Sequence, residues 1–225
     1  MSGGSVERHF DQIAPRYDRW KEKARYYYEA VKASVAEIVP PHSRVLEVGC
    51  GTGDILASLH PADGLGVDIS PGMVEAAARK HPELRFRVQD LLDQPPDEHF
   101  PYIVAVDVVE HVPDLNRCVA TMAAMLAPGG RLVVVTANPS WGPFLEVAER
   151  LGLKMPEGEH TWRSHADILA AAQACGLREH SFNRSFMVPK AVPGLRSLNT
   201  ARWARRLRQR SGLIQRAVFE ATPPA

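Results

Sequence analysis

The chain has 225 residues, of which 45% are hydrophobic, and its 27 Lys and Arg residues nearly balance its 26 Asp and Glu residues. This length and apolar share favour one well-buried domain over two, and the neutral balance argues against a protein built as a whole to bind polyanions. The chain has no apolar run of membrane-spanning length, no apolar signal core in its first residues and no CxxC pair. We therefore expect a cytoplasmic protein without a disulfide framework or a thiolate zinc site.

Amphipathic helical spacing marks the first segment, residues 1–40, where one or two helices are expected ahead of the main domain. This segment carries Tyr17, Trp20 and the run Tyr26-Tyr27-Tyr28. We interpret it as a helical lid, with a plain packing helix as the alternative. Residues 41–225 then form the main domain.

Short runs rich in Val, Ile and Leu alternate with helical patterns in the main domain. Strands are expected at 44–48, 64–68, 84–88, 102–106, 131–136, near 177–183 and at 216–221, with helices at 54–59, 71–80, 114–126 and 164–175. Such alternation is typical of an α/β fold. We predict a Rossmann-like, seven-stranded, mostly parallel sheet with helices on both faces and a basic insertion at about 184–215 before the last strand.

The strongest motif is VLEVGCGTGD at residues 45–54, a strand that runs through glycines spaced G-x-G-x-G into a helix. Glycines let the backbone turn sharply and approach a ligand closely. The second strand ends at Asp68, where a carboxylate could accept both hydroxyls of a ribose, and the third is followed by Asp90, suitably placed for an adenine amino group. Three consecutive strand ends therefore define one crevice for a nucleotide-like cofactor.

The ordered segments EVGCGTG, GVDIS with PGMVEAA, QDL, DVVEHV and LAPGG resemble the motifs of class I S-adenosylmethionine-dependent methyltransferases, over about residues 40–183. The opening HFDQIAPRYDRW also resembles the N-terminal segment of ubiquinone- and biotin-pathway methyltransferases. The resemblance implies S-adenosyl-L-methionine as the cofactor. The residues that it implies for the cofactor site are Tyr17, Glu47, Gly49, Cys50, Gly51, Gly53, Asp68, Ile69, Met73, Asp90, Leu91 and Asp107.

Methyl transfer is an in-line displacement at an activated carbon, so the protein mainly has to position and desolvate the reactants. A base is optional, and His111 is the candidate because imidazole titrates near neutrality; a histidine that only orders its loop is the alternative. The candidates for the acceptor pocket are aromatic or His residues of the lid and the loops: Trp20, His111, Trp141, Phe144, His160, Trp162 and Phe186. We expect a small-molecule acceptor, methylated on a hydroxyl oxygen, with nitrogen and carbon open.

The segment Asp107-x-x-Glu110-His111 also resembles the acid-x-x-Glu-His cluster of metal-assisted hydroxyl methyltransferases, of the ubiquinone-pathway and small-RNA types. His160 or His165 could then supply a fourth ligand to a divalent ion. The first position in those enzymes is usually Glu, whereas here it is Asp, one methylene shorter. We therefore favour an ordinary role in the cofactor loop and the pocket, and no metal.

Other functions are open at this point. An NAD-dependent oxidoreductase is disfavoured by the QDL and DVVEHV elements, and a catalytically silent cofactor-binding partner by the intact glycine turn. The basic run at 202–210 could bind RNA, phosphate groups or an acidic lipid surface, but we favour a solvated helical face with Trp203, Leu207 and Leu213 packed inward. Nucleic acid is not an expected partner, because no Asn/Asp-Pro-Pro-Tyr sequence follows the fourth strand.

Overall fold

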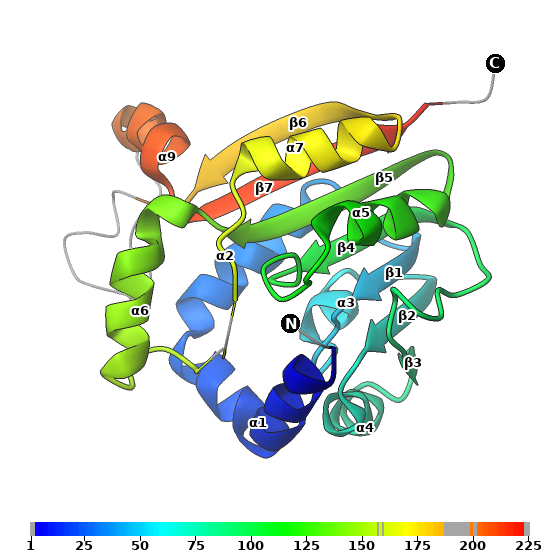
Figure 1. Ribbon diagram of the computed structural model, residues 1–225, viewed down its shortest axis with the longest axis horizontal. Helices are drawn as coiled ribbons and strands as arrows, with labels where there is room; N and C mark the ends of the chain where they lie inside the picture. The colour runs from blue at the N-terminus through cyan, green and yellow to red at the C-terminus, as the bar shows by residue number, and fades with distance from the viewer. Residues whose placement is uncertain (1–2, 157, 159, 187–198, 200–201, 223–225) are drawn as a thin grey trace.

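Seven strands form a single sheet in the order β3-β2-β1-β4-β5-β7-β6 (Figure 1). The structure is a computed structural model that describes residues 3–156, 158, 160–186, 199 and 202–222. Their bounds are β1 (Arg44–Val48), β2 (Asp63–Asp68), β3 (Arg85–Val88), β4 (Phe100–Val106), β5 (Leu126–Ala137), β6 (Leu177–Ser185) and β7 (Ile214–Ala221). The pairs from β3 to β5 are parallel, whereas β7 runs antiparallel to both β5 and β6. The predicted mostly parallel, seven-stranded sheet is confirmed.

Helices cover both faces of this sheet (Figure 1). They are α2 (Arg25–Ala36), α3 (Asp54–Ser58), α4 (Pro71–Lys80), α5 (Leu115–Ala124) and α7 (His165–Ala174). Successive strand side chains point to opposite faces. Ile103 therefore packs in one apolar cluster, with Val119 of α5 and Ile168 of α7, whereas its neighbour Val104 packs in the other, with Val31 of α2. Two cores, one on each face, fix the strand ends that carry the site.

The first 40 residues form two helices with different roles. The second helix, α2, buries Val31 and Val35 completely and is part of the core. The first helix, α1 (Gly3–Lys23), lies beyond the strand ends, where Asp11 accepts hydrogen bonds from Ser70 Oγ at 3.1 Å and from the Gly72 N–H at 2.7 Å. Of the two, α1 is therefore the helix positioned to act as a lid, and that role stays a prediction.

Several element boundaries differ from the sequence-based expectation. The helix expected at 114–126 ends at Ala124, because Leu126 already pairs with Phe100 at the start of β5. The Pro-Gly-Gly segment that follows is absorbed as an irregularity in that pairing, between Phe100 and Tyr102. The insertion before the last strand is also shorter than expected, since β6 continues to Ser185 and β7 begins at Ile214.

The sequence analysis assigns no element between residues 136 and 164, where the structure has the helix α6 (Gly142–Arg150). Leu145 of α6 packs against the core, whereas Phe144 and Val147 are exposed, so its apolar residues lie on both the inner and the outer face. Among the described residues of the basic run, Leu213 is buried as expected, but Leu207 is 45% exposed, so the inward packing predicted for it is wrong; the side chain of Trp203 lies outside the described part.

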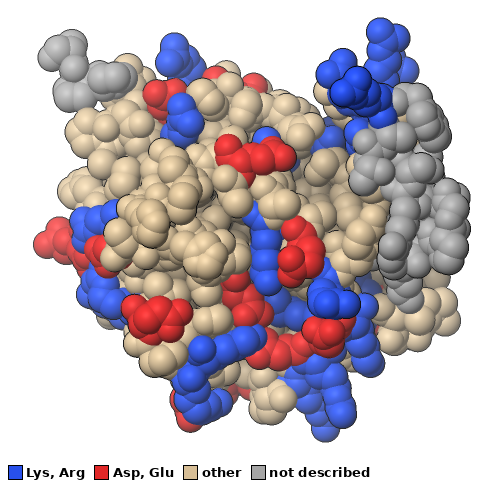
Figure 2. Space-filling view, turned by 180° about the vertical axis from the view of Figure 1, so that it is seen from behind, with Lys and Arg blue, Asp and Glu red and all other residues tan. Residues whose placement is uncertain are grey.

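The short helix α9 (Arg205–Ser211) carries the basic run on the surface. On the face shown in Figure 2, Lys and Arg side chains gather over α9, whereas basic and acidic side chains are interspersed elsewhere. Within the ranges that the structure describes, no helix is long and apolar enough to cross a membrane.

Candidate functional site

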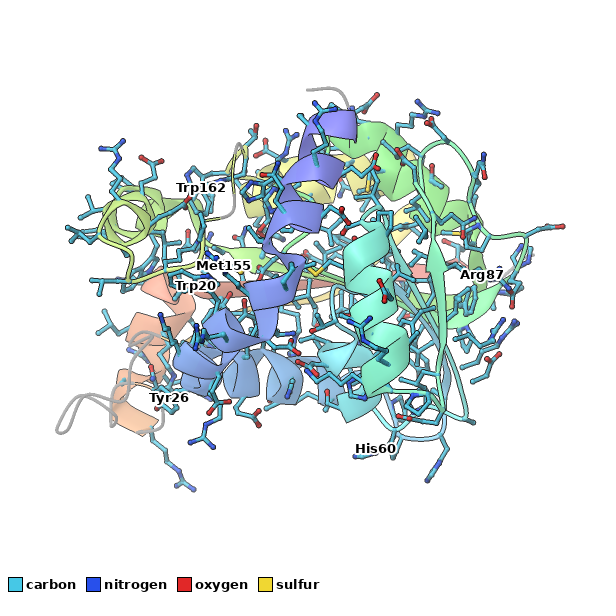
Figure 3. All side chains as sticks on the ribbon, turned by 90° about the horizontal axis from the view of Figure 1, so that it is seen from below. Trp20, Tyr26, His60, Arg87, Met155 and Trp162 are labelled. Carbon is cyan, nitrogen blue, oxygen red and sulfur yellow. The ribbon has the colours of Figure 1, made fainter. Side chains whose placement is uncertain are left out.

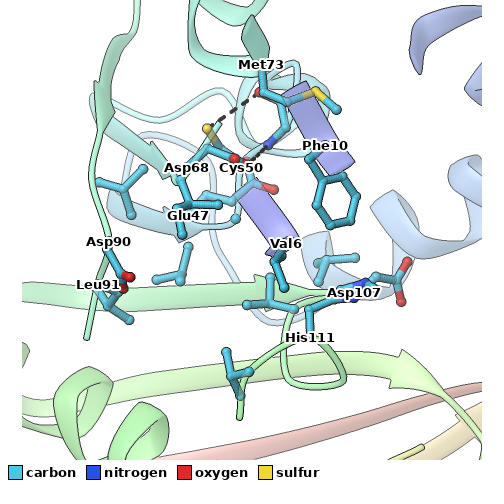
Figure 4. A pocket seen from close by; sticks show the side chains of 18 of the residues that line it. Val6, Phe10, Glu47, Cys50, Asp68, Met73, Asp90, Leu91, Asp107 and His111 are labelled. Atoms are coloured by element: carbon cyan, nitrogen blue, oxygen red, sulfur yellow. Dashed lines mark hydrogen bonds between the residues drawn. The ribbon is translucent and has the colours of Figure 1, made fainter. Parts of the chain in front are cut away.

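A pocket of about 320 Å³ opens beyond the carboxyl ends of β1, β2 and β4, with α1 across it (Figure 4). Between β1 and β4 the strand order reverses, because β2 and β3 extend the sheet to one side and β5 to the other. Ligands of open α/β sheets bind at such a switch point. The pocket therefore lies where the topology predicts a ligand.

The glycine turn lets the backbone enter the pocket. Gly49 and Gly51 have φ angles of +66° and +49°, which residues with a side chain rarely adopt. A Cβ at Gly49 would lie 2.4 Å from Val108 Cγ2, so the close approach of the two loops also requires glycine. Gly53, with φ +79°, is the residue just before α3 and lies outside the pocket lining, so it shapes the turn rather than the wall.

Asp68, at the end of β2, is held rigidly toward the pocket. Its Oδ2 accepts the Gly51 N–H at 2.8 Å and its Oδ1 accepts the Ser70 N–H at 2.9 Å. Burial raises the pKa of Asp68, and these backbone N–H groups oppose the shift. Because each carboxylate oxygen has two lone pairs, both oxygens can still accept a ligand hydroxyl.

Glu47 and Lys21 form the charged end of the pocket. The Glu47 side chain is only 1% exposed, and its Oε2 accepts the Leu56 N–H at 3.0 Å. Burial raises the pKa of Glu47 to about 8, against the opposing effect of the Lys21 ammonium. The sequence analysis missed Lys21, although it follows Tyr17 by four residues and so shares its helix face.

The opposite end of the pocket is built from the segment after β3. Asp90 Oδ1 accepts the Leu92 N–H at 2.9 Å, which fixes the loop, and Arg117 of α5 donates to the Leu92 carbonyl at 2.7 Å. Asp90, Leu91 and Leu92 all line the pocket. This end combines an apolar wall with a carboxylate at its edge.

Asp107 and His111 stand at the end of β4. Asp107 has a φ of +53°, uncommon for a residue with a side chain, and its N–H donates to the Val135 carbonyl at 2.9 Å. His111 is 7% exposed, and its ring and that of Phe10 of α1 are perpendicular to each other at a centroid distance of 5.1 Å. An imidazole therefore faces the pocket in a largely dry setting.

The predicted cofactor residues come together: all of them except Gly53 line this pocket. Lining residues that the sequence analysis missed include Val6, Phe10, Lys21, Tyr28 and Arg117. The first four of these come from α1 and α2, whose path over the strand ends no local pattern specifies.

The predicted acceptor residues are more scattered, and only His111 lines the pocket. His160 and Trp162 continue outward from His111, with ring centroids 6.1 Å and then 4.6 Å apart. Trp20 and Trp162 both lie on the α6 side of α1 (Figure 3). The other three candidates lie elsewhere: Phe144 is 70% exposed, Trp141 Nε1 donates to the Ser211 carbonyl, and Phe186 packs on Tyr26 and Tyr27.

Across the described ranges, no three His, Cys, Asp or Glu side chains lie where they could hold a metal ion. Asp107, Glu110 and His111 therefore do not form a ligand set. His165 is paired with Glu179 at 2.6 Å and stacks on Phe182, and both partners belong to β6. The site shows no geometry that favours the metal-assisted alternative.

Comparison with known proteins agrees with this geometry. A family described as a methyltransferase domain matches residues 20–181. The ubiquinone biosynthesis O-methyltransferase of Bradyrhizobium sp. (strain ORS 278) is 32% identical over 128 residues, which cover 53% of this chain and 51% of the relative. The chain thus spans about half the length of this relative.

Two solved structures share the fold over nearly their whole length. A chain in the complex between the Haloferax volcanii Trm112 methyltransferase activator and a methyltransferase has a TM-score of 0.74 and 23% identity, covering 95% of this chain and 97% of that one. Magnesium protoporphyrin IX methyltransferase from Synechocystis PCC 6803, with bound SAH, has a TM-score of 0.70 and 18% identity, covering 98% and 99%.

The family match and the fold confirm the resemblance that the sequence motifs indicated, and they set aside the NAD-dependent oxidoreductase. They also confirm S-adenosylmethionine as the cofactor. The chain belongs to the family of S-adenosylmethionine-dependent methyltransferases.

Proposed function

We propose that the protein transfers a methyl group from S-adenosylmethionine to a hydroxyl oxygen of a small, flat and largely apolar acceptor. Five carboxylates, those of Glu47, Asp68, Asp90, Asp93 and Asp107, line one pocket, and this observation carries the cofactor part of the proposal. The cofactor is a cation at its sulfonium and ammonium groups and a hydroxyl and amine donor at its nucleoside, so an acid-lined pocket complements it.

The residues fit the cofactor in a consistent order. Glu47 and Asp107 would face its cationic part, Asp68 its ribose hydroxyls, and Asp90 with Leu91 its adenine. The bound cofactor supplies a methyl group already activated for displacement. The protein then has to exclude water and hold the acceptor, and α1 with Phe10 and Tyr17 would do so from above.

His111 is the proposed general base. It lines the same pocket as Asp107, and its ring contacts those of Phe10 and His160. It would accept the proton that the acceptor hydroxyl loses as the oxygen is methylated. A hydroxyl acceptor is supported by the name of the 32% identical relative, an O-methyltransferase. An apolar acceptor is supported by the wall formed by Phe10, Val112 and Pro113.

Calorimetric titration with S-adenosylmethionine, S-adenosylhomocysteine and NAD is the first test. We expect micromolar binding of the two sulfur compounds and none of NAD; binding of NAD alone would contradict the proposed function. An acceptor screen of matched phenols and anilines, followed by mass spectrometry, then tests the acceptor atom. Products methylated at oxygen support the proposal, and products methylated only at nitrogen overturn the choice of oxygen.

A further inference from the structure

The loop between β4 and α5 carries His111, and regular secondary structure does not set its shape. Asp107, its first residue, has a positive φ angle, and within the loop the His111 N–H donates to the Val108 carbonyl at 2.9 Å. Irregular backbone leaves carbonyl groups that need partners from elsewhere in the chain. Those partners determine where the His111 ring lies in the pocket (Figure 4).

Three carbonyl groups of this loop accept hydrogen bonds from the short segment just before α7. The Thr161 N–H donates to the Glu110 carbonyl at 2.8 Å. The Arg163 guanidinium donates from Nε to the Val109 carbonyl at 3.3 Å and from Nη2 to the Val112 carbonyl at 2.9 Å. A single side chain therefore bridges the turn that contains the proposed base.

Arg163 is half-buried, and its own backbone is held by the sheet. Gln215 of β7 is 1% exposed, and its Nε2 donates to the Arg163 carbonyl at 2.7 Å. Ser164, the next residue, caps α7 with its side chain. Because Nε and Nη2 belong to one planar, rigid guanidinium, the two bonds to the loop keep a fixed relative geometry. Arg163 therefore links the position of β7 to that of the loop after β4.

We propose that Arg163 is a positioning residue for methyl transfer, because it fixes the loop that holds His111 toward the acceptor. The inference rests on the proposed role of His111 as the base. A general base acts only within hydrogen-bond reach of the proton that it accepts, and a displacement of about 1 Å can slow a reaction about 100-fold. Arg163 is not among the residues that line the described pocket, so it acts through His111 rather than on either ligand.

Single-turnover kinetics in a double-mutant cycle with His111→Ala test this. The assay uses the full chain, saturated with cofactor, and the phenol that the acceptor screen identifies. We expect Arg163→Met to slow methyl transfer about 10- to 100-fold, with cofactor affinity changed less than about 3-fold. In the His111→Ala background the same substitution should slow transfer less than about 3-fold, because residues that act as a unit are not additive.

The matched control is Arg178→Met, because the Arg178 side chain on β6 is 79% exposed. It should change the rate less than about 2-fold. Arg163→Lys keeps the charge but has no planar fork to bridge two carbonyls, so we expect it to slow transfer about 3- to 10-fold.

The imidazole signals of His111 provide a measurement that needs neither acceptor nor turnover. They are identified in the ¹H–¹⁵N spectrum by their absence from His111→Ala. We expect Arg163→Met to shift or broaden them, because the ring no longer has one fixed environment. His42 and His60 precede β1 and β2 at the opposite edge of the sheet, and their signals should stay in place. A general loosening of the fold would change all of these signals.

The outcomes separate positioning of His111 from other roles of Arg163. Equal slowing by Arg163→Met in both backgrounds, an unchanged rate, or unchanged His111 signals would each overturn the inference and leave the role of His111 intact. If Arg163→Met does not fold, as judged by its melting curve, Arg163→Lys provides the test, and a wild-type rate in that variant overturns the inference. A wild-type rate in His111→Ala alone would instead contradict the proposed role of His111, on which the inference rests.

Discussion

Cofactor affinity should rise steeply with pH because of Glu47. Burial raises the pKa of Glu47 to about 8 in the empty site, whereas a cation bound beside it requires the carboxylate. Cofactor binding must then displace the Glu47 proton from nearly all protein molecules at about pH 6 and from a smaller fraction of them at about pH 7.5. With a pKa of about 8, the cost of removing this proton falls between the two pH values, and cofactor affinity rises by roughly 20-fold, or about 2 kcal/mol.

Titration calorimetry at these two pH values, in buffers of different ionisation enthalpy, measures both the affinity and the released proton. Glu47→Gln is the control, because its amide oxygen can still accept the Leu56 N–H but has no proton to lose. Its affinity should therefore vary less with pH than that of the wild type, and the remaining dependence comes from the cofactor's own amine and from Asp68, whose pKa is also raised by burial. Equal pH slopes for the variant and the wild type would refute the reasoning.

The same carboxyl group makes a second, independent contribution to pH dependence. The folded protein keeps the Glu47 proton up to a pH of about 8, whereas the unfolded chain, with a pKa of 4.5, loses it earlier. Between these two values the folded state binds more protons than the unfolded state, so the contribution of Glu47 to stability decreases as pH rises.

The remaining predictions address the cofactor, the acceptor and the core. Asp68→Asn should weaken cofactor binding by roughly 10- to 100-fold, or about 1.4 to 2.8 kcal/mol, because the amide loses the charge that strengthens the ribose hydrogen bonds; titration checks this, and unchanged affinity would exclude Asp68 from the ribose site. His111→Ala should slow methyl transfer about 100-fold or more at saturating cofactor with nearly unchanged cofactor affinity. Single-turnover kinetics measure the rate and calorimetry measures the affinity. A lower affinity with an unchanged rate would contradict the role of His111 as a base. Leu46→Ala, in the fully buried centre of β1, should lower the free energy of unfolding by about 2 to 5 kcal/mol, whereas the exposed Leu153→Ala should change it by less than about 0.5 kcal/mol. Denaturant titration measures both, and similar small losses would mean that β1 is not at the centre of the core.

The elements whose signals are local could be predicted from the amino-acid sequence alone. A turn with positive φ angles needs glycine, so Gly49 and Gly51 could be recognised without any tertiary contact. Ser70 accepts the N–H of Met73 and caps α4, which is also a local signal. Parallel strands bring their carboxyl ends to one edge, so a residue that ends its strand, such as Asp68, is placed by counting alone.

The side chains that complete the pocket come from distant segments, and only folding of the whole chain brings them together. Phe10 and Lys21 belong to α1, and their position over the strand ends depends on contacts such as that of Asp11 with α4. Trp141 and Phe144 have the same aromatic character as Phe10, yet the path of the chain after β5 carries them away from the pocket. Propensity and spacing act over a few residues, whereas the packing of one element on another is a property of the whole core. For this reason the strand ends that form the pocket could be predicted from the sequence, whereas the position of α1 over them could not.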